Sequence, residues 1–384
     1  MPRTLAALIF AAAFACAEDA VLKEAPQADT EQGAPHGIGI IDVNQDGKPD
    51  VVVDQIRPSG INIFLTDAKG GLKGDYNKML GTRMGPNWGM AADVDGDGLR
   101  DFAQMDNNST KLSVYKGSKG KLQEGQETDL GVGWPIAGWF HDMNGDRRPD
   151  FIVVGWPDPV VDKTPGRLKV FLGPTLKESF SLNIPECGAV VAGDVTGDKK
   201  ADVITSDQKG SVLLVYPGAG NGLFAKEALK VKLDEGGANL KPNGMGIADL
   251  DGDKVLDLAV CCEEQNFVRV MKGDGKGGFT KLTDIVTSKK AKFAVVGDFN
   301  GDKNIDLACG ACVVAAGATW SVTIQLNDGK GVFTQNCEFT GKGNFHRYSA
   351  AAGDYDLDKK DDLVVAVINE DEGSGSVRRY LSKK

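Results

Sequence analysis

The chain has 384 residues, of which 26% are charged, and its formal net charge is −10 at pH 7. This length could hold two or three average domains, but a closed ring of β-sheets commonly reaches this size as one domain. The acidic balance, without a clustered basic stripe, argues against a nucleic-acid-binding protein. No linker or low-complexity tract interrupts residues 18–384, so we expect a single domain there.

The first 17 residues carry an export pattern. Arg3 precedes an apolar stretch over residues 5–14, and Ala15-Cys16-Ala17 follows. This order is typical of a secretory signal peptide, and the stretch is too short to span a membrane as a stable helix. We therefore expect a secreted or periplasmic monomer without a transmembrane segment. Cys16 leaves a lipid anchor at the cell surface as the alternative.

Seven copies of one nine-residue loop, Asp-x-(Asp/Asn/Thr)-x-Asp-x-x-x-Asp, follow along the chain. Their first residues are 51, 49, 52, 55, 49 and 56 residues apart. A regular period near 50 residues indicates a repeat architecture in which each unit is one supersecondary module. Side-chain oxygens stand at loop positions 1, 3, 5 and 9 in every copy. These residues are Asp42, Asn44, Asp46, Asp50; Asp93, Asp95, Asp97, Asp101; Asp142, Asn144, Asp146, Asp150; Asp194, Thr196, Asp198, Asp202; Asp249, Asp251, Asp253, Asp257; Asp298, Asn300, Asp302, Asp306; and Asp354, Asp356, Asp358, Asp362.

This spacing of oxygen atoms predicts a hard cation. Ca²⁺ takes six to eight oxygen ligands in a flexible geometry, whereas Mg²⁺ requires a tighter octahedron and keeps its waters. Transition metals prefer His or Cys, and neither occupies these positions. We expect up to seven Ca²⁺ ions, with the weakest binding at Thr196, because ligand charge tunes affinity. The alternative is that the Asp and Asn side chains only form turns with their own backbone.

Short apolar runs around the loops predict the fold. A small-and-apolar run precedes each loop, a β-branched run follows it, and two more runs complete the period, as in 189–193, 203–206 and 212–216. Four short runs per period indicate strands, which is the pattern of a β-propeller with seven blades. The last copy leaves room for only two more strands. We expect residues 20–28 to supply the missing outer strand of blade seven.

The chain resembles the FG-GAP/VCBS-repeat family, to which the N-terminal propellers of integrin α subunits belong. The resemblance rests on the seven Asp loops and on the Gly-rich corners 273–279 and 327–333, and it covers about residues 36–370. It implies an all-β, seven-bladed propeller with a calcium loop in each blade. It says less about function, because this scaffold carries adhesion modules and enzymes alike.

A candidate ligand site follows from the residues that precede each inner strand. In a propeller these residues surround the central opening on the face opposite the Asp loops. Outside the loop carboxylates, bases outnumber acids, which favours an acidic glycan or protein as the extracellular partner. The candidates are His36, Asn87, Trp88, Asn243, Lys292, His346, Arg347 and Tyr348.

Two alternatives to this binding site stay open. Pro35-His36-Gly37 and Pro242-Asn243-Gly244 also have the form of plain turns. No catalytic motif is present, so we assign no catalytic residue and favour a non-catalytic binding or adhesion-like module. A polysaccharide-degrading lyase or hydrolase that uses His36, His346, Arg347 and Tyr348 is the alternative function.

Six cysteines follow the predicted signal peptide. Cys261 and Cys262 should lie on a strand next to the one that carries Cys309 and Cys312, so a bridge between the two pairs is one interpretation. Cys187 and Cys337 complete the set. Sequence does not fix a pairing, and buried free thiols are the alternative.

Overall fold

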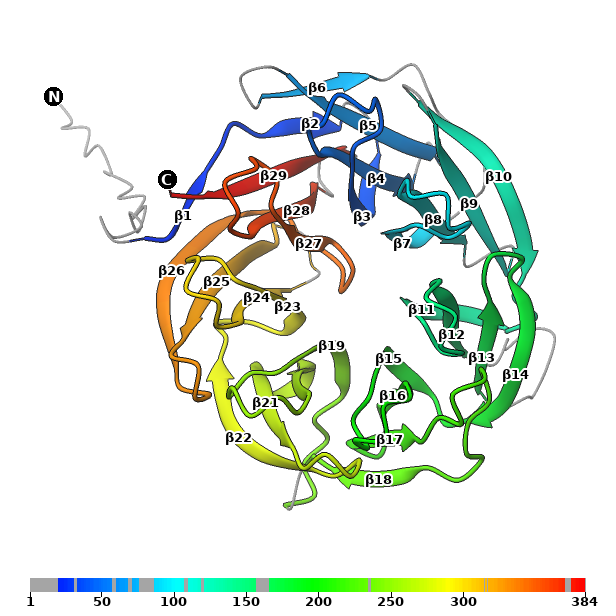
Figure 1. Ribbon diagram of the computed structural model, residues 1–384. Helices are drawn as coiled ribbons and strands as arrows, with labels where there is room; N and C mark the ends of the chain where they lie inside the picture. Colours follow the sequence, from blue (N-terminus) through cyan, green and yellow to red (C-terminus); the bar gives the residue numbers. More distant parts are fainter. Residues whose placement is uncertain are drawn as a thin grey trace, which may run out of the picture.

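The computed structural model describes residues 20–30, 33–56, 60–67, 71–75, 86–106, 110–118, 121–156, 166–233, 236–313, 315, 317–369 and 374–383. Within these ranges the chain forms 29 β-strands and one 3-10 helix, η1 (Glu263–Gln265). The strands build seven antiparallel sheets around a central axis, as Figure 1 shows. None of the described helices has the length and apolar character that crossing a membrane requires. The predicted signal peptide lies outside the described residues.

Each of the first six blades contains four consecutive strands, and the first of the four is the innermost. Blade one is β3 (Ala34–Ile41), β4 (Asp50–Ile56), β5 (Gly60–Thr66) and β6 (Leu72–Asp75). Blade two is β7 (Pro86–Ala92), β8 (Asp101–Asp106), β9 (Lys111–Ser118) and β10 (Lys121–Asp129). Blade three is β11 (Trp134–His141), β12 (Asp150–Trp156), β13 (Gly166–Leu172) and β14 (Lys177–Ile184). Blade four is β15 (Cys187–Gly193), β16 (Asp202–Asp207), β17 (Val212–Tyr216) and β18 (Leu229–Lys232). Blade five is β19 (Pro242–Ala248), β20 (Asp257–Cys262), β21 (Phe267–Gly273) and β22 (Phe279–Val286). Blade six is β23 (Ala291–Gly297), β24 (Asp306–Cys312), β25 (Thr319–Asn327) and β26 (Phe333–Lys342).

Blade seven combines both ends of the described chain. Its three inner strands are β27 (Ala350–Gly353), β28 (Asp362–Asn369) and β29 (Ser374–Ser382). Two short N-terminal strands, β1 (Leu22–Glu24) and β2 (Ala28–Thr30), both pair with β29. The expected single strand over 20–28 is thus two shorter strands on either side of Pro26, which has no N–H to donate. The pairing covers the outer edge of β29 (Figure 1).

The hydrophobic core is divided into seven clusters, one between each pair of neighbouring blades. Val52 and Ile63 of blade one meet Phe102 of blade two, and the same arrangement closes the ring between blades seven and one. The cluster between blades six and seven includes Leu22 of β1. A single blade cannot bury both of its apolar faces, so the repeats are stable only when stacked. The all-β, seven-bladed fold predicted from the sequence is confirmed.

The inner strands begin with an irregularity in pairing. The register between first and second strands shifts near Pro35, Pro86, Pro135 and Pro242, and also near Cys187 and Ala291. Proline cannot donate a ladder hydrogen bond, so it is tolerated at a bulge. In blade one, the buried Asp54 carboxylate accepts the N–H groups of His36 and Gly37 at 3.2 and 2.5 Å.

We expect the N-terminal strands to contribute measurably to stability. Leu22 is fully buried, whereas the neighbouring Lys23 is exposed on the same strand. Leu22→Ala should destabilise the protein by about 2–5 kcal/mol in urea unfolding because it leaves a cavity in the core. The matched control, Lys23→Ala, should change stability by less than about 0.5 kcal/mol. Equal stability of the two variants would contradict this role.

Candidate metal loops and the central cavity

The Asp loops connect the first and second strands of every blade and share one backbone conformation. Positions 4 and 6 are left-handed in all seven copies, even where Gln45 (φ 57°) and Leu357 (φ 62°) replace glycine. The position-1 carboxylate holds this shape with both oxygens. Asp93, for example, accepts the N–H groups of Gly96 and Gly98 at 2.9 and 3.0 Å. The first Asp therefore anchors the backbone of the loop.

The Asp at position 9 is buried in every blade and connects two parts of it. One carboxylate oxygen accepts the N–H of loop position 2, and the other accepts an N–H at the end of the third strand. The 14 distances lie between 2.6 and 3.1 Å. We call this pair of hydrogen bonds the latch. Its donors are Val43 and Thr66, Val94 and Gly117, Met143 and Gly173, Val195 and Gly218, Leu250 and Gly273, Phe299 and Asn327, and Tyr355 and Ser382.

Three loops gather carboxylates closely enough to hold a metal ion. In each, the Asp residues at positions 1, 3 and 9 offer oxygens that lie within 4.8 Å of one another. They are the loops of blades two, five and seven, the copies with Asp at position 3. The clusters are Asp93, Asp95 and Asp101; Asp249, Asp251 and Asp257; and Asp354, Asp356 and Asp362.

Position 5 lies outside these clusters, although the sequence pattern includes it. Its carboxylate instead accepts the N–H of position 7, as Asp253 does from Val255 at 2.9 Å. Where position 3 is Asn, its amide donates to the same carboxylate, as Asn144 does to Asp146 at 3.2 Å. Individual ligand roles for positions 1, 3, 5 and 9 thus stay a prediction for all seven loops.

The chemistry of the three clusters fits a hard divalent cation. All their donors are oxygens, which suits Ca²⁺ better than a transition metal. Burial raises the pKa of the position-9 carboxyls, to about 6 for Asp101, Asp257 and Asp362. A cation beside them would favour the charged form and offset this penalty. His141, next to the loop of blade three, is not part of any of these clusters.

Two of the three clusters already contain a positive charge. The Lys116 ammonium lies 2.7 Å from Asp95, and the Lys272 ammonium lies 2.7 Å from Asp253 and also contacts Asp251. Each lysine directly precedes the glycine whose N–H completes the latch. In blade seven the corresponding residue is Leu381, so this position supplies no ammonium to Asp354 and its neighbours.

The opposite ends of the inner strands hold a buried polar network. Lys292 is paired with Glu263 at 2.6 Å, and Glu263 also accepts from the Asn243 amide at 2.7 Å. The ring centroids of His36 and His346 lie 4.0 Å apart, and the two rings are tilted by 37°. Burial lowers the pKa of both histidines, to about 4 for His346, where Arg347 and Lys292 contribute. The histidines are therefore neutral at pH 7.

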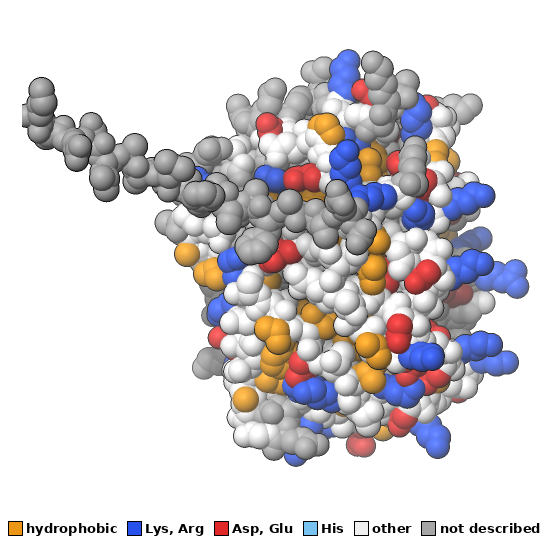
Figure 2. Space-filling model, turned by 90° about the vertical axis from the view of Figure 1, so that its left-hand side faces the viewer, with side chains coloured by type: hydrophobic (Ala, Val, Ile, Leu, Met, Phe, Trp, Pro, Cys, Tyr) orange, Lys and Arg blue, Asp and Glu red, His pale blue; other side chains and the backbone are white. Residues whose placement is uncertain are grey.

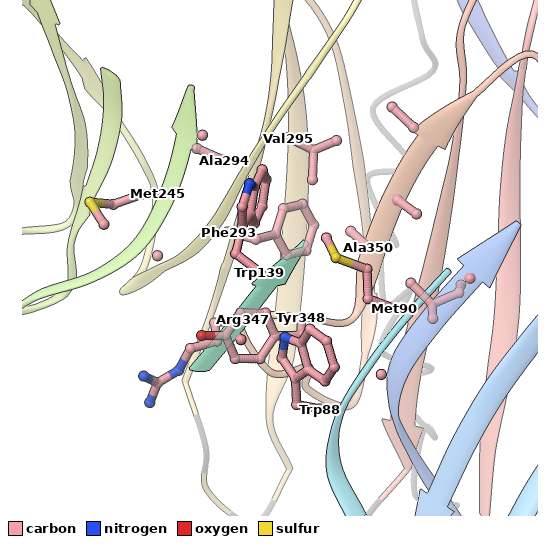
Figure 3. Close-up of a pocket in the computed structure, with 18 of the residues that line it drawn as sticks. Trp88, Met90, Trp139, Met245, Phe293, Ala294, Val295, Arg347, Tyr348 and Ala350 are labelled. Carbon is pink, nitrogen blue, oxygen red and sulfur yellow. The ribbon is translucent and has the colours of Figure 1, made fainter. Parts of the chain in front are cut away.

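Residues 345–349, which precede β27, cross the central channel at this end. The Arg347 guanidinium donates to the Gly188 carbonyl oxygen of β15, in the fourth blade. The Tyr348 ring lies 6.4 Å from that of Trp88, in the second blade. Beyond this crossing lies a cavity of about 300 Å³ (Figure 3). The innermost strands of all seven blades contribute to its wall.

The predicted ligand residues thus fall into two groups. Trp88, Arg347 and Tyr348 line the cavity. His36, Asn243, Lys292 and His346 do not line it, and the first two are less than 10% exposed. The side chain of Asn87 lies outside the described part of the chain. The six cysteines from Cys187 to Cys337 are buried free thiols, so the suggested bridge between blades five and six is not formed.

Two features of the surface were not among the predicted site residues. Trp134, at the start of β11, is 41% exposed on the face opposite the Asp loops. The Asp loops themselves carry a Lys or Arg at position 6, 7 or 8 in every copy. In a side view, basic side chains gather along one edge of the molecule with acidic ones between them (Figure 2). These basic residues can be found in the sequence by comparing positions 6–8 of the seven loops.

The family of the chain follows from this repeat. The model of the FG-GAP-like repeat matches residues 42–104, 93–153, 194–260 and 249–309, more than half of the chain. The protein belongs to the FG-GAP-like repeat family. No curated protein matches the sequence.

Solved structures share the fold at low sequence identity. A chain of BBS1N in complex with ARL6DN, soaked with lead, has a TM-score of 0.60 at 10% identity and covers 95% of this chain and 98% of its own. An Agrocybe aegerita lectin, whose structure concerns recognition of non-reducing terminal N-acetylglucosamine, has a TM-score of 0.55 at 18% identity, covering 82% and 86%. A functionally unknown protein from Desulfotomaculum acetoxidans has a TM-score of 0.54 at 11% identity, covering 86% and 88%.

The latch predicts a stabilising role for position 9 that does not depend on metal. Asp202 lies in blade four, whose loop has Thr196 at position 3, and Asp257 lies in a carboxylate cluster. In chelator, Asp202→Ala and Asp257→Ala should each destabilise the protein by about 2–5 kcal/mol, because two buried N–H groups lose their acceptor.

The matched control is Asp198→Ala, an exposed position-5 residue in the same loop as Asp202. It should change stability by less than about 1 kcal/mol. Urea unfolding measures the stability of all three variants. A negligible effect of Asp202→Ala would show that the position-9 carboxylate matters only as a metal ligand.

Proposed function

We propose that this protein is a calcium-stabilised binding module, without a catalytic role, that recognises a glycan on the face opposite the Asp loops. The observation that carries the proposal is the exposed tryptophan of blade three. Trp134 is the only exposed large aromatic side chain among the described residues. It lies opposite Trp156 in the register of β11 and β12. An exposed indole offers an apolar platform on which the C–H face of a sugar ring can stack.

Polar groups beside this platform suit sugar hydroxyls. Trp156 donates from its indole nitrogen to the Cys187 carbonyl oxygen at 2.5 Å, which joins blade three to blade four. The next residue toward the N-terminus, Glu186, forms an ion pair with Lys209 at 2.8 Å. The Lys209 side chain is 79% exposed. Aromatic and hydrogen-bonding groups on one surface are what carbohydrate recognition needs.

The fold shared with the Agrocybe aegerita lectin supports a binding role but does not identify a ligand for this chain. A protein partner is the other occupant that a face of this kind could take. Export through the predicted signal peptide belongs to the same proposal, because extracellular modules can rely on weak calcium sites.

The enzymatic alternative has less support from the geometry. A lyase or hydrolase in the central opening would need its acid–base groups and its cationic groups in one pocket. Arg347 and Tyr348 line the cavity, whereas His36 and His346 do not. Lys292 is neutralised by Glu263, which also weakens the expectation of an acidic ligand at this point.

The glycan proposal is tested on an array of neutral and acidic glycans. Binding is expected for the parent protein, and Trp134→Ala should weaken it about tenfold or more, as loss of an aromatic hot spot does. The matched control is Leu223→Ala, a similarly exposed apolar residue elsewhere on the surface (44%). Absence of binding to any glycan, or undiminished binding by Trp134→Ala, would contradict the proposal.

The calcium proposal predicts a metal-dependent melting temperature. Ca²⁺ should raise it relative to chelator, because an ion that binds only the folded state shifts the equilibrium by mass action. Mg²⁺ should restore part of the gain, since it demands a stricter geometry. Calorimetry in calcium, magnesium and chelator measures this. An identical melting curve in calcium and chelator would contradict it.

Lys272 provides a sharper test of the same sites. Its ammonium occupies the carboxylate cluster of blade five and should compete with the ion. Lys272→Met should therefore destabilise the protein in chelator and increase the stabilisation that calcium gives. Lys254→Met, which removes a lysine from position 6 of the same loop, is the control. Equal calcium responses of both variants would count against competition.

A further inference from the structure

The wall of the central cavity is mostly apolar, and its polar side chains are Arg100, Arg347 and Tyr348. Trp88, Met90, Trp139, Met245 and Phe293 project from the inner strands of several blades around it (Figure 3). Its volume of about 300 Å³ is at the lower end of the range found for small-molecule sites. A wall of this kind favours a ligand with an aromatic or branched apolar body.

The cavity opens toward the Asp loops and is closed at the other end. Along β7, Trp88 and Gly89 are buried, whereas Met90, Ala91 and Ala92 are half-buried. The same gradient occurs on β11, where residues 136–138 are buried and 139–141 are half-buried. The segment 345–349 forms the closed end. A ligand would therefore enter from the Asp-loop face, which is not the face of the proposed glycan site.

The closed end contains two polar groups that lie beside each other and leave part of their hydrogen-bonding capacity unused. Arg347 forms no ion pair among the described residues, and its guanidinium donates to the Gly188 carbonyl oxygen. The nearby acid Glu263 is held by Lys292 at 2.6 Å and by Lys241 at 3.6 Å. The Tyr348 hydroxyl is buried and makes no hydrogen bond of normal geometry. Both residues line the cavity.

These two groups have the chemistry of a carboxylate receptor. A guanidinium is always charged and presents five N–H donors, of which one or two suffice for a carboxylate. Burial raises the pKa of Tyr348 well above its usual value, with Arg347 offsetting part of the effect, so the hydroxyl stays a donor. A charge-assisted hydrogen bond is stronger than one between neutral groups, and a largely apolar surrounding strengthens it further.

We propose that the central cavity binds a small monocarboxylate with an apolar body. The carboxylate accepts hydrogen bonds from Arg347 and from the Tyr348 hydroxyl at the closed end. The apolar body packs against Trp88, Trp139 and Phe293. The wall contains one further cation, Arg100 of the Asp loop of blade two, whose guanidinium donates to the Ile40 carbonyl oxygen at 3.3 Å. We place the anion at Arg347 because the Tyr348 hydroxyl offers a second donor there. This site is independent of the proposed glycan site.

The probe is 4-phenylbutyrate, compared with the neutral 4-phenyl-1-butanol of nearly the same shape. Trp88 and Trp139 line the cavity, so their fluorescence and calorimetry both report binding. The acid should bind saturably, and the alcohol about tenfold or more weaker, because it leaves the guanidinium without an anion. Equal binding of acid and alcohol, or no binding of the acid, would overturn the proposal.

Four variants at three positions locate the site. Arg347→Met should abolish the preference for the acid, and Arg347→Lys should keep part of it. Tyr348→Phe retains the ring and should weaken the acid several-fold, which keeps the test valid if Arg347→Met fails to fold. Val295→Trp fills the cavity from β23 and should prevent binding of either probe.

Trp134→Ala is the control, since it removes the proposed glycan platform and should leave phenylbutyrate binding unchanged. An undiminished affinity of folded Arg347→Met or Val295→Trp for the acid would show that the probe binds elsewhere. Loss of glycan binding alone, with the acid still bound, would refute only the glycan site.

Discussion

The two hydrogen bonds from each position-9 Asp are the interaction on which the blades depend. One end of the latch fixes the loop between the first and second strands, and the other fixes the end of the third strand (2.6–3.1 Å in all blades). A buried carboxylate that accepts two backbone N–H groups replaces contacts that water would otherwise make. The seven latches set the mutual position of three strands in each blade, and apolar packing between blades then closes the ring.

The arrangement of carboxylates that could hold a metal ion is built on this frame and differs among the blades. Among the described residues, only the loops with Asp at position 3 gather three carboxylates. In two of these loops an Asp forms an ion pair with the ammonium of Lys116 or Lys272. In blade seven, Leu381 occupies the position of these lysines. A built-in cation reduces repulsion among the acids without an ion, but it competes with one. Blade seven is also the blade that both ends of the described chain complete, so a calcium ion there would stabilise the closure of the ring.

The sequence predicted the ring and the position of its loops because both follow from a local repeat. The three all-Asp loops are the three carboxylate clusters of the structure. The second role of position 9 was not predictable, because its donors on the third strand lie 16 to 23 residues away. The crossing of the channel by residues 345–349 was missed for a similar reason. Arg347 contacts Gly188, 159 residues distant, and nothing in the local pattern signals this contact.

The most direct test of the role of the latch is to measure amide hydrogen exchange of its donor N–H groups in chelator. If the latch is the primary interaction, its two donor N–H groups are protected from exchange in every blade without calcium. In blade four these donors are Val195 and Gly218. Protection should be the same in blade four, which lacks a carboxylate cluster, as in blade five. Fast exchange of these amides in chelator, with protection regained only when calcium is added, would contradict the account.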